Sequence, residues 1–279
     1  MQKELSLAYS PCPNDTFLFY HLVHESLSET LRVQEELYDV EQLNQFAGEA
    51  RFDVTKLSFA AFFHVMQNYA LLDSGSALGR NCGPILIRKK GKVVKSPTEE
   101  KILVPGLQTT ANLLLNLHFD KKCSVVATRY DKVIPALLRE EYSYGVIIHE
   151  ERFTFAAQGL EMVVDLGEWW ETETGKPIPL GAIAIQRSLA ETYQQEFGKK
   201  LRQSLELAYA HPEKTKNYIK ENSQSIEEEV IQKHIDLYVN DFTRELGEEG
   251  KEAVLTLYEK ATALGLAPTT DVKNIFAGY

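Results

Sequence analysis

The sequence LSLAYSPCPNDTF, residues 5–17, predicts a strand, a turn and the start of a helix in immediate succession. The run Leu5–Tyr9 is typical of a strand, and two prolines then fix the backbone and remove two hydrogen-bond donors. Asn14, Asp15 and Thr16 offer side-chain oxygens where the helix begins. Such a junction directs free backbone N–H groups above the strand end, which suits an anion. A helix cap without a ligand is the alternative interpretation.

Strand-like and helix-like segments alternate up to residue 187, which predicts an α/β fold with largely parallel sheets. The predicted strands are Leu5–Tyr9, Leu31–Leu37, Val54–Leu57, Ile85–Arg88, Ile102–Val104, Ser124–Thr128, Gly145–Ile148, Met162–Leu166 and Ala182–Ile185. The predicted helices among them are Thr16–His24, Val40–Ala47, Phe59–Asn68, Thr110–Phe119, Lys132–Glu140 and Glu168–Thr174.

The rest of the chain is predicted to be helical and to pack on the first lobe of two. Amphipathic patterns cover Leu189–Ala210, Pro212–Glu221, Ile226–Phe242 and Glu248–Leu264. The polar stretch Lys89–Pro97 fits a surface hairpin or a crossing between lobes, and Ala182–Arg187 fits a second crossing. Two crossings predict a first lobe of residues 1–90 and 184–279 and an inserted second lobe of residues 91–183. The cleft between the lobes is the expected small-molecule site.

The composition excludes several classes of function. A formal net charge of −10 and the lack of a basic run argue against nucleic acid as a partner. No apolar run approaches the roughly 20 residues of a membrane helix, and no secretory signal is evident, so we expect a cytoplasmic protein. The three cysteines have no metal-ligand spacing and an odd number, which fits a reducing compartment.

Polar residues follow predicted strands at four places, where the sheets of parallel α/β folds bind ligands. These places are Ser10–Thr16, Thr55–Ser58, Val104–Thr110 and Gly145–Glu150. Three of them are helix starts with hydroxyl or amide side chains, which together suit a carboxylate and several hydroxyls. Lys56 can add a charge-assisted bond. Each helix start taken alone is more often a cap than a ligand site.

His149 is the candidate general base, because an imidazole accepts protons near neutral pH and an apolar strand would hold it rigidly. A structural histidine that bonds to the backbone is the alternative. The other six histidines fall within helical patterns and are expected to be packing or surface residues. Cys12 near a helix start is a potential nucleophile, but no paired base is evident nearby, so a small buried filler is favoured.

Ten short blocks carry a resemblance to a known family: Ser10–Phe17, Thr55–Ser58, Ala77–Arg80, Thr109–Ala111, Ile147–Glu150, Val164–Gly167, Trp169–Trp170, Pro179–Ile183, Ala210–Glu213 and Tyr238–Asn240. In combination they resemble the 1,4-dihydroxy-6-naphthoate synthases of the futalosine route to menaquinone. The match runs over nearly the whole chain, and the combination is specific whereas any single block is not.

The resemblance implies a two-lobed, periplasmic-binding-protein-like fold of type II. It implies a lyase that converts cyclic dehypoxanthinyl futalosine to 1,4-dihydroxy-6-naphthoate and dihydroxyacetone without a metal or redox cofactor. His149 is then the proton acceptor. The matched substrate-binding segments are Lys56-Leu57-Ser58 and Thr109-Thr110, and we extend the expected pocket to Asn14, Asp15 and Asn44.

Two alternatives stay open. A solute-binding protein for a small carboxylate would share the fold, since a fold does not fix function, but the missing signal peptide counts against it. A chorismate dehydratase of the same pathway would also share the fold, and the His149 segment favours the synthase instead. The sequence leaves the oligomeric state open, a homodimer included.

Overall fold

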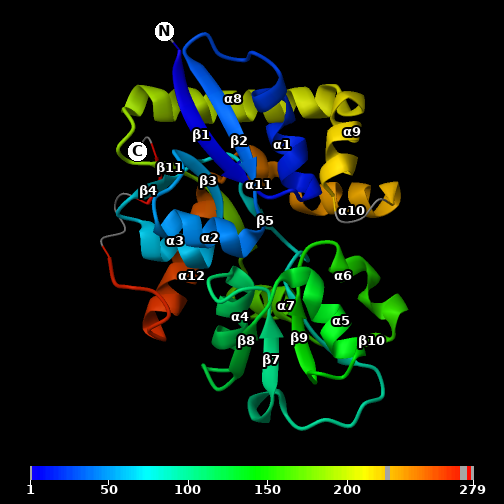
Figure 1. The fold of residues 1–279 in the computed structure, drawn as a ribbon. Coiled ribbons are helices and arrows are strands. Elements are labelled where there is room, and N and C mark those ends of the chain that lie inside the picture. Colours follow the sequence, from blue (N-terminus) through cyan, green and yellow to red (C-terminus); the bar gives the residue numbers. More distant parts are fainter. Residues whose placement is uncertain (1, 224–226, 271–274, 278–279) are drawn as a thin grey trace.

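Two mixed β-sheets, one above the other in Figure 1, form the framework of the molecule. The computed structural model describes residues 2–223, 227–270 and 275–277. The first sheet has the order β2 (Leu31–Leu37), β1 (Lys3–Tyr9), β3 (Val54–Ser58), β11 (Ile178–Gln186) and β4 (Tyr69–Leu71), and β5 (Ala77–Gly79) also pairs with β11. The second sheet has the order β10 (Leu160–Asp165), β6 (Ile85–Lys89), β9 (Tyr144–Ile147), β7 (Lys101–Val104) and β8 (Ser124–Ala127).

Helices surround both sheets (Figure 1). Those around the first sheet are α1 (Pro13–His24), α2 (Val40–Gly48), α3 (Phe59–Val65), α8 (Glu191–Ala210), α9 (Pro212–Asn222), α10 (Glu228–Tyr238), α11 (Asp241–Arg244) and α12 (Gly247–Ala263). Those around the second sheet are α4 (Thr110–His118), α5 (Val133–Leu138), α6 (Glu151–Thr154) and α7 (Leu166–Thr174), with short 3-10 turns at Pro97–Glu99, Tyr130–Lys132 and Phe155–Gln158.

The sheets are less parallel than the alternation predicts. β1 runs parallel to β2 and β3, and β7 runs parallel to β8 and β9. β11 is antiparallel to β3, β4 and β5, and β6 is antiparallel to β9 and β10. The reason is that β6 and β11 follow the crossings between the lobes and so enter each sheet against the direction of its βαβ units.

The expected lobe boundaries need correction at both crossings. β6, placed within residues 1–90 of the first lobe, pairs in the second sheet, and all of β11 pairs in the first. The stretch Lys89–Pro97 leads from β6 to the 3-10 turn that precedes β7. Because β6 and β7 belong to the same sheet, this stretch does not cross between the lobes. We propose crossings at residues 80–84 and 175–177. An apolar pattern predicts a strand but not the sheet that the strand joins, which explains the error.

The C-terminal helices return to the first lobe as expected. α8 and α9 pack against α1, and α12 packs against β11 and α4. The helix predicted over Ile226–Phe242 ends at Tyr238, because the Asn240 side chain accepts a hydrogen bond from the Phe242 N–H and starts α11. Residue 226 lies outside the described residues.

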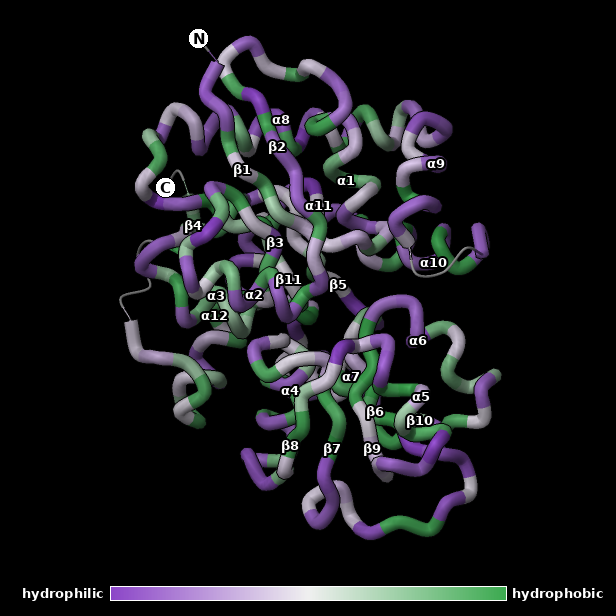
Figure 2. Tube along the Cα trace, viewed as in Figure 1, coloured by the Kyte–Doolittle hydropathy of each residue, from purple (hydrophilic) through white to green (hydrophobic). Residues whose placement is uncertain are grey.

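One hydrophobic core runs through both lobes. It joins Leu57 of β3 and Phe62 of α3 to Leu114 of α4 and Val146 of β9, all fully buried. A second core lies between the first sheet and helices α1 and α8. Figure 2 shows the central strands of the second sheet largely green, whereas the edge strand β2 is largely purple. The lobes are therefore packed together on the side of α3 and α4.

Candidate active site

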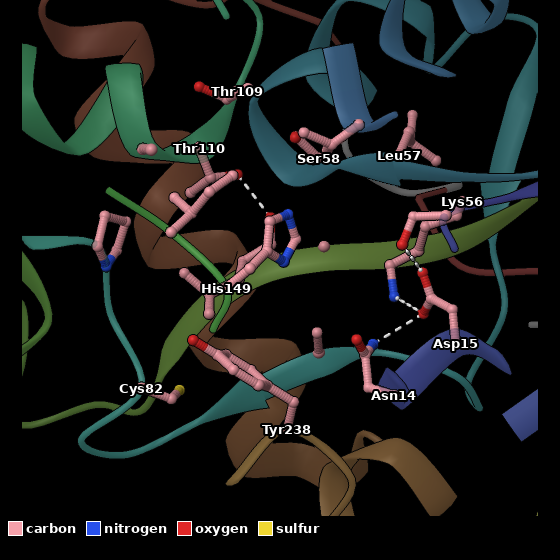
Figure 3. A pocket seen from close by; sticks show the side chains of 18 of the residues that line it. Asn14, Asp15, Lys56, Leu57, Ser58, Cys82, Thr109, Thr110, His149 and Tyr238 are labelled. Carbon is pink, nitrogen blue, oxygen red and sulfur yellow. Dashed lines mark hydrogen bonds and ion pairs between the residues drawn. The ribbon is translucent and has the colours of Figure 1, made fainter. Parts of the chain in front are cut away.

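A cavity of about 680 Å³, measured out to its open mouth, lies between the two sheets. Strand ends and helix starts of both lobes line the cavity, together with α10 (Figure 3). The lining residues are Ser10, Asn14, Asp15, Val40, Lys56, Leu57, Ser58, Ala77, Cys82, Pro84, Thr109, Thr110, Ala111, Ile148, His149, Leu180, Gly181, His234 and Tyr238.

The start of α1 supplies a buried carboxylate to this cavity. Asp15 accepts hydrogen bonds from the Ser10 hydroxyl at 2.8 Å, from Asn14 Nδ2 at 2.8 Å and from Lys56 Nζ at 2.6 Å. Pro13 occupies the first turn of the helix, and the N-cap residue Cys12 makes no side-chain cap bond. The anion that the sequence predicts at this junction is therefore the side chain of Asp15 itself, placed favourably near the helix N-terminus.

Lys56 on β3 balances that charge. Its ammonium and the Asp15 carboxylate are 8% and 2% exposed, so the ion pair is buried. A buried carboxylate without such a partner would be strongly destabilising. An ammonium has three donors, and one goes to Asp15, so Lys56 has donors left for an oxygen of a ligand.

Ser58 presents a hydroxyl donor to the cavity. Its Oγ accepts a hydrogen bond from Asn44 Nδ2 at 3.2 Å, and its N–H donates to Asn44 Oδ1 at 2.8 Å. The hydroxyl makes no cap bond in α3, which leaves its proton for a ligand. Asn44 itself is buried behind Ser58 and does not line the cavity, so the structure places it as a support of Ser58.

The two threonines at the start of α4 differ in their contacts. Thr109 is the N-cap, because its Oγ1 accepts from the Asn112 N–H and donates to the Gly106 carbonyl. The hydroxyl of Thr110 donates to the Leu180 carbonyl of β11 at 2.7 Å, so it ties α4 to the first lobe. Thr110 thus contributes to the packing between lobes as well as to the cavity wall.

His149 follows β9 and faces the cavity from the second lobe (Figure 3). Its backbone has φ of 57°, a left-handed conformation that is uncommon for residues other than glycine and that clusters at functional sites. The pKa of its imidazole is lowered to about 4, because burial and the charge of Lys56 lower it by more than the charge of Asp15 raises it. The ring is therefore neutral at pH 7 and able to accept a proton.

Cys12 is the neighbour of this imidazole. Its Sγ lies 3.5 Å from His149 Nδ1 and 3.9 Å from Nε2, so a base is near Cys12 after all. Burial and the charges of Glu150 and Asp15 raise the pKa of the thiol well above its usual range. The thiol stays protonated, so the geometry supports a packing role for Cys12 rather than a nucleophilic one.

The sequence interpretation missed the contribution of α10. His234 and Tyr238 line the cavity from this helix, and His234 Nε2 lies 2.9 Å from Asn14 Oδ1. Since Asn14 Nδ2 donates to Asp15, its Oδ1 is the acceptor, and His234 carries its proton on Nε2. Burial lowers the pKa of His234 well below its usual value. An amphipathic pattern does not show which polar residue of a buried helix face meets a ligand.

The structure brings eight of the nine expected site residues together around one cavity, and Asn44 stands directly behind them. Within residues 2–223, 227–270 and 275–277, no group of three or more His, Cys, Asp or Glu side chains has the arrangement of a metal site. No helix in the same part of the chain is long and apolar enough to cross a membrane.

Two lobes around a cleft place the molecule in the periplasmic-binding-protein-like class of folds. A solved structure of this class is the alkanesulfonate-binding protein SsuA from Xanthomonas axonopodis pv. citri bound to MOPS. It matches 96% of each chain with a TM-score of 0.72 and 12% identity. At that identity the likeness shows the fold alone.

The chain belongs to the menaquinone biosynthesis family, whose model matches residues 5–263. The chain is 43% identical over 267 residues to the 1,4-dihydroxy-6-naphthoate synthase of Thermus thermophilus, covering 94% of this chain and 96% of that protein. It is 37% identical over 270 residues to the synthase of the same name from Streptomyces coelicolor, covering 95% of each. Protein AF1704 from Archaeoglobus fulgidus matches with a TM-score of 0.89 and 34% identity, over 94% of this chain and 98% of that one. The chain is thus an enzyme of menaquinone biosynthesis that acts on a small molecule.

Proposed function

We propose that the chain is a carbon–carbon lyase that converts cyclic dehypoxanthinyl futalosine to 1,4-dihydroxy-6-naphthoate and dihydroxyacetone. The observation that carries the proposal is the imidazole of His149, which lines the same cavity as the potential donors Lys56 and Ser58. Two relatives named as 1,4-dihydroxy-6-naphthoate synthases, similar over nearly the full chain, support the same reaction.

His149 acts as the general base. One of its ring nitrogens takes the proton of a hydroxyl on the sugar-derived part of the substrate. The O–H electron pair forms a carbonyl as the adjacent carbon–carbon bond breaks, in the manner of a retro-aldol cleavage. The electrons of the broken bond enter the bicyclic ring system, which becomes aromatic, and His149 returns its proton to the products. Proton transfer by a positioned base typically contributes about 10²–10⁴-fold to the rate.

The remaining residues bind and orient the substrate. Lys56 and Ser58 donate to its oxygens, and the start of α4 near Thr109 places the positive end of a helix beside the cavity. The apolar residues Val40, Leu57 and Leu180 pack against its ring. A substrate held between two lobes is oriented for reaction and shielded from water.

The test is to incubate the purified protein with cyclic dehypoxanthinyl futalosine and identify the products by mass spectrometry. We expect a naphthoate and a three-carbon ketone in equal amounts. His149→Ala should abolish turnover while the substrate still binds. His211 is an exposed histidine at the end of α8. The His211→Ala variant is the matched control and should convert the substrate at the normal rate.

Two results would contradict the proposal. Tight binding without conversion by the unsubstituted protein would favour a solute-binding protein. A His149→Ala variant with a near-normal rate would exclude His149 as the base.

A further inference from the structure

Glu41 on α2 of the first lobe reaches a backbone segment of the second lobe. Both oxygens of its carboxylate lie 3.2 Å from the backbone nitrogen of Gln108, which donates its N–H to them. Gln108 directly precedes Thr109, the N-cap of α4. Burial raises the pKa of the half-buried Glu41 carboxyl, while the Gln108 N–H opposes that shift. The contact is therefore a charge-assisted bond between the lobes, in a partly desolvated place.

The segment before Gln108 is shaped to receive this carboxylate. Gly106 has a backbone φ of +150°, which residues other than glycine rarely adopt. A Cβ atom at Gly106 would lie 2.3 Å from Glu41 Oε2 and 2.4 Å from its Cδ. Only a residue without a side chain permits this approach between backbone and carboxylate.

Glu41 is also connected to the cavity wall of its own lobe. Its Oε2 accepts a hydrogen bond from Asn44 Nδ2 at 3.3 Å. The same amide group donates to Ser58 Oγ at 3.2 Å, and Asn44 Oδ1 accepts from the Ser58 N–H. One carboxylate is thus linked through Asn44 to Ser58 in the first lobe and through Gln108 to Thr109 in the second.

We propose that Glu41 is a positioning residue that holds the two lobes in the closed arrangement and keeps Ser58 and Thr109 at a fixed separation for substrate binding. Glu41 does not line the cavity, so it acts through these neighbours. The part of the proposal that concerns substrate rests on the proposed function. The apparent affinity of a ligand that requires the closed form falls in proportion to the population of that form.

The expected effect is a change in KM with little change in kcat. Glu41→Gln keeps the size of the side chain but removes its charge, so its amide oxygen can accept the Gln108 N–H only in a weaker, neutral hydrogen bond, whereas Glu41→Ala removes the acceptor altogether. Loss of one charge-assisted hydrogen bond is worth on the order of tenfold in an equilibrium constant. We therefore expect KM for the proposed substrate to rise about tenfold in Glu41→Ala and by a smaller factor in Glu41→Gln, with kcat within about twofold in both. Glu49→Gln, at the exposed end of the same helix, is the matched control.

A second readout needs no substrate. Hydrogen exchange of the Gln108 amide, measured by NMR on the full chain, should become faster in both Glu41 variants and stay unchanged in Glu49→Gln. Slow exchange at Gln108 in both Glu41 variants would overturn the contact between the lobes. Faster exchange with an unchanged KM would overturn the positioning role. A change in melting temperature with KM intact would also overturn it, because a merely structural residue behaves in that way.

Failure of the proposed function is distinguishable from failure of this inference. If the unsubstituted protein does not convert the futalosine derivative, the exchange rate at Gln108 still decides whether Glu41 holds the lobes together. In that case the dissociation constant for the same molecule replaces KM, and an equal value in the Glu41 and Glu49 variants would refute the positioning role.

Discussion

The buried ion pair between Asp15 and Lys56 should contribute to stability only as a pair. The two charged groups lie 2.6 Å apart, and their side chains are 2% and 8% exposed. We consider Asp15→Asn, Lys56→Met and the double variant. Each single change leaves one buried group without its counter-charge, whereas the double change removes both charges and keeps the volume of both side chains nearly constant.

The size of the effect follows from the burial of the pair. Removal of one partner of a buried ion pair costs about 3–5 kcal/mol, because the remaining charge is left uncompensated. The free energy of unfolding of a native protein is only about 5–15 kcal/mol. Each single variant should therefore lose a large part of its stability. The double variant should be more stable than either, with a coupling energy of at least about 2 kcal/mol.

Urea unfolding of the unsubstituted protein and the three variants, followed by circular dichroism, measures this coupling energy. The unfolding midpoints can be compared directly when the slope of the free energy against urea concentration is the same in all four proteins. Effects that add to within about 0.5 kcal/mol would refute the reasoning, because they are typical of independent sites. Turnover provides a separate check. The double variant should recover stability but not activity, because it lacks the donors that Lys56 offers to the substrate in the proposed function.

Three further outcomes are expected. The pKa of about 4 for His149 predicts that kcat/KM falls only as pH drops toward that value, since the neutral form is the base; a step near the ordinary histidine pKa in the pH profile would contradict this. Thr109→Ala should lower the free energy of unfolding by about 1 kcal/mol through loss of the helix cap, whereas Ser58→Ala should raise KM and also lower the free energy of unfolding, because the buried Asn44 amide loses its acceptor. His234→Ala should destabilise by about 1–3 kcal/mol because Asn14 Oδ1 loses its donor, and His234→Gln should rescue part of that stability in the same urea assay; equal loss in both variants would refute the bond.

Local sequence patterns predict those residues of the cavity wall that lie at the ends of helices and strands. Thr109 and the apolar strand before His149 carry recognisable patterns, because a helix cap and a buried strand depend on residues close in sequence. The alternation of elements and the family resemblance together also predicted the two-lobed fold. They did not predict which sheet β6 joins, because strand pairing depends on partners far along the chain.

Contacts between distant segments escaped prediction for the same reason. Cys12 and His149 are 137 positions apart, and no local pattern shows that their side chains meet. His234 belongs to an ordinary amphipathic helix until the fold turns that helix toward Asn14. No local pattern around Glu41 indicates a partner in the other lobe, and the contact depends on the approach of Gly106, which lies 65 positions further along the chain.

The low pKa of His149 is compatible with its proposed role as a base, because the causes of the shift should change when substrate binds. Burial and the positive charge of Lys56 both disfavour the imidazolium in the free protein, and the charge of Asp15 opposes them only in part. An anionic substrate held by Lys56 would offset that charge and stabilise the imidazolium directly, so the pKa of His149 should rise toward the working pH. A base is most effective when its pKa lies near that pH. The acid limb of kcat, which reports the complex, should therefore lie at higher pH than the acid limb of kcat/KM, which reports the free enzyme. Coincident limbs would show that the substrate charge does not reach His149.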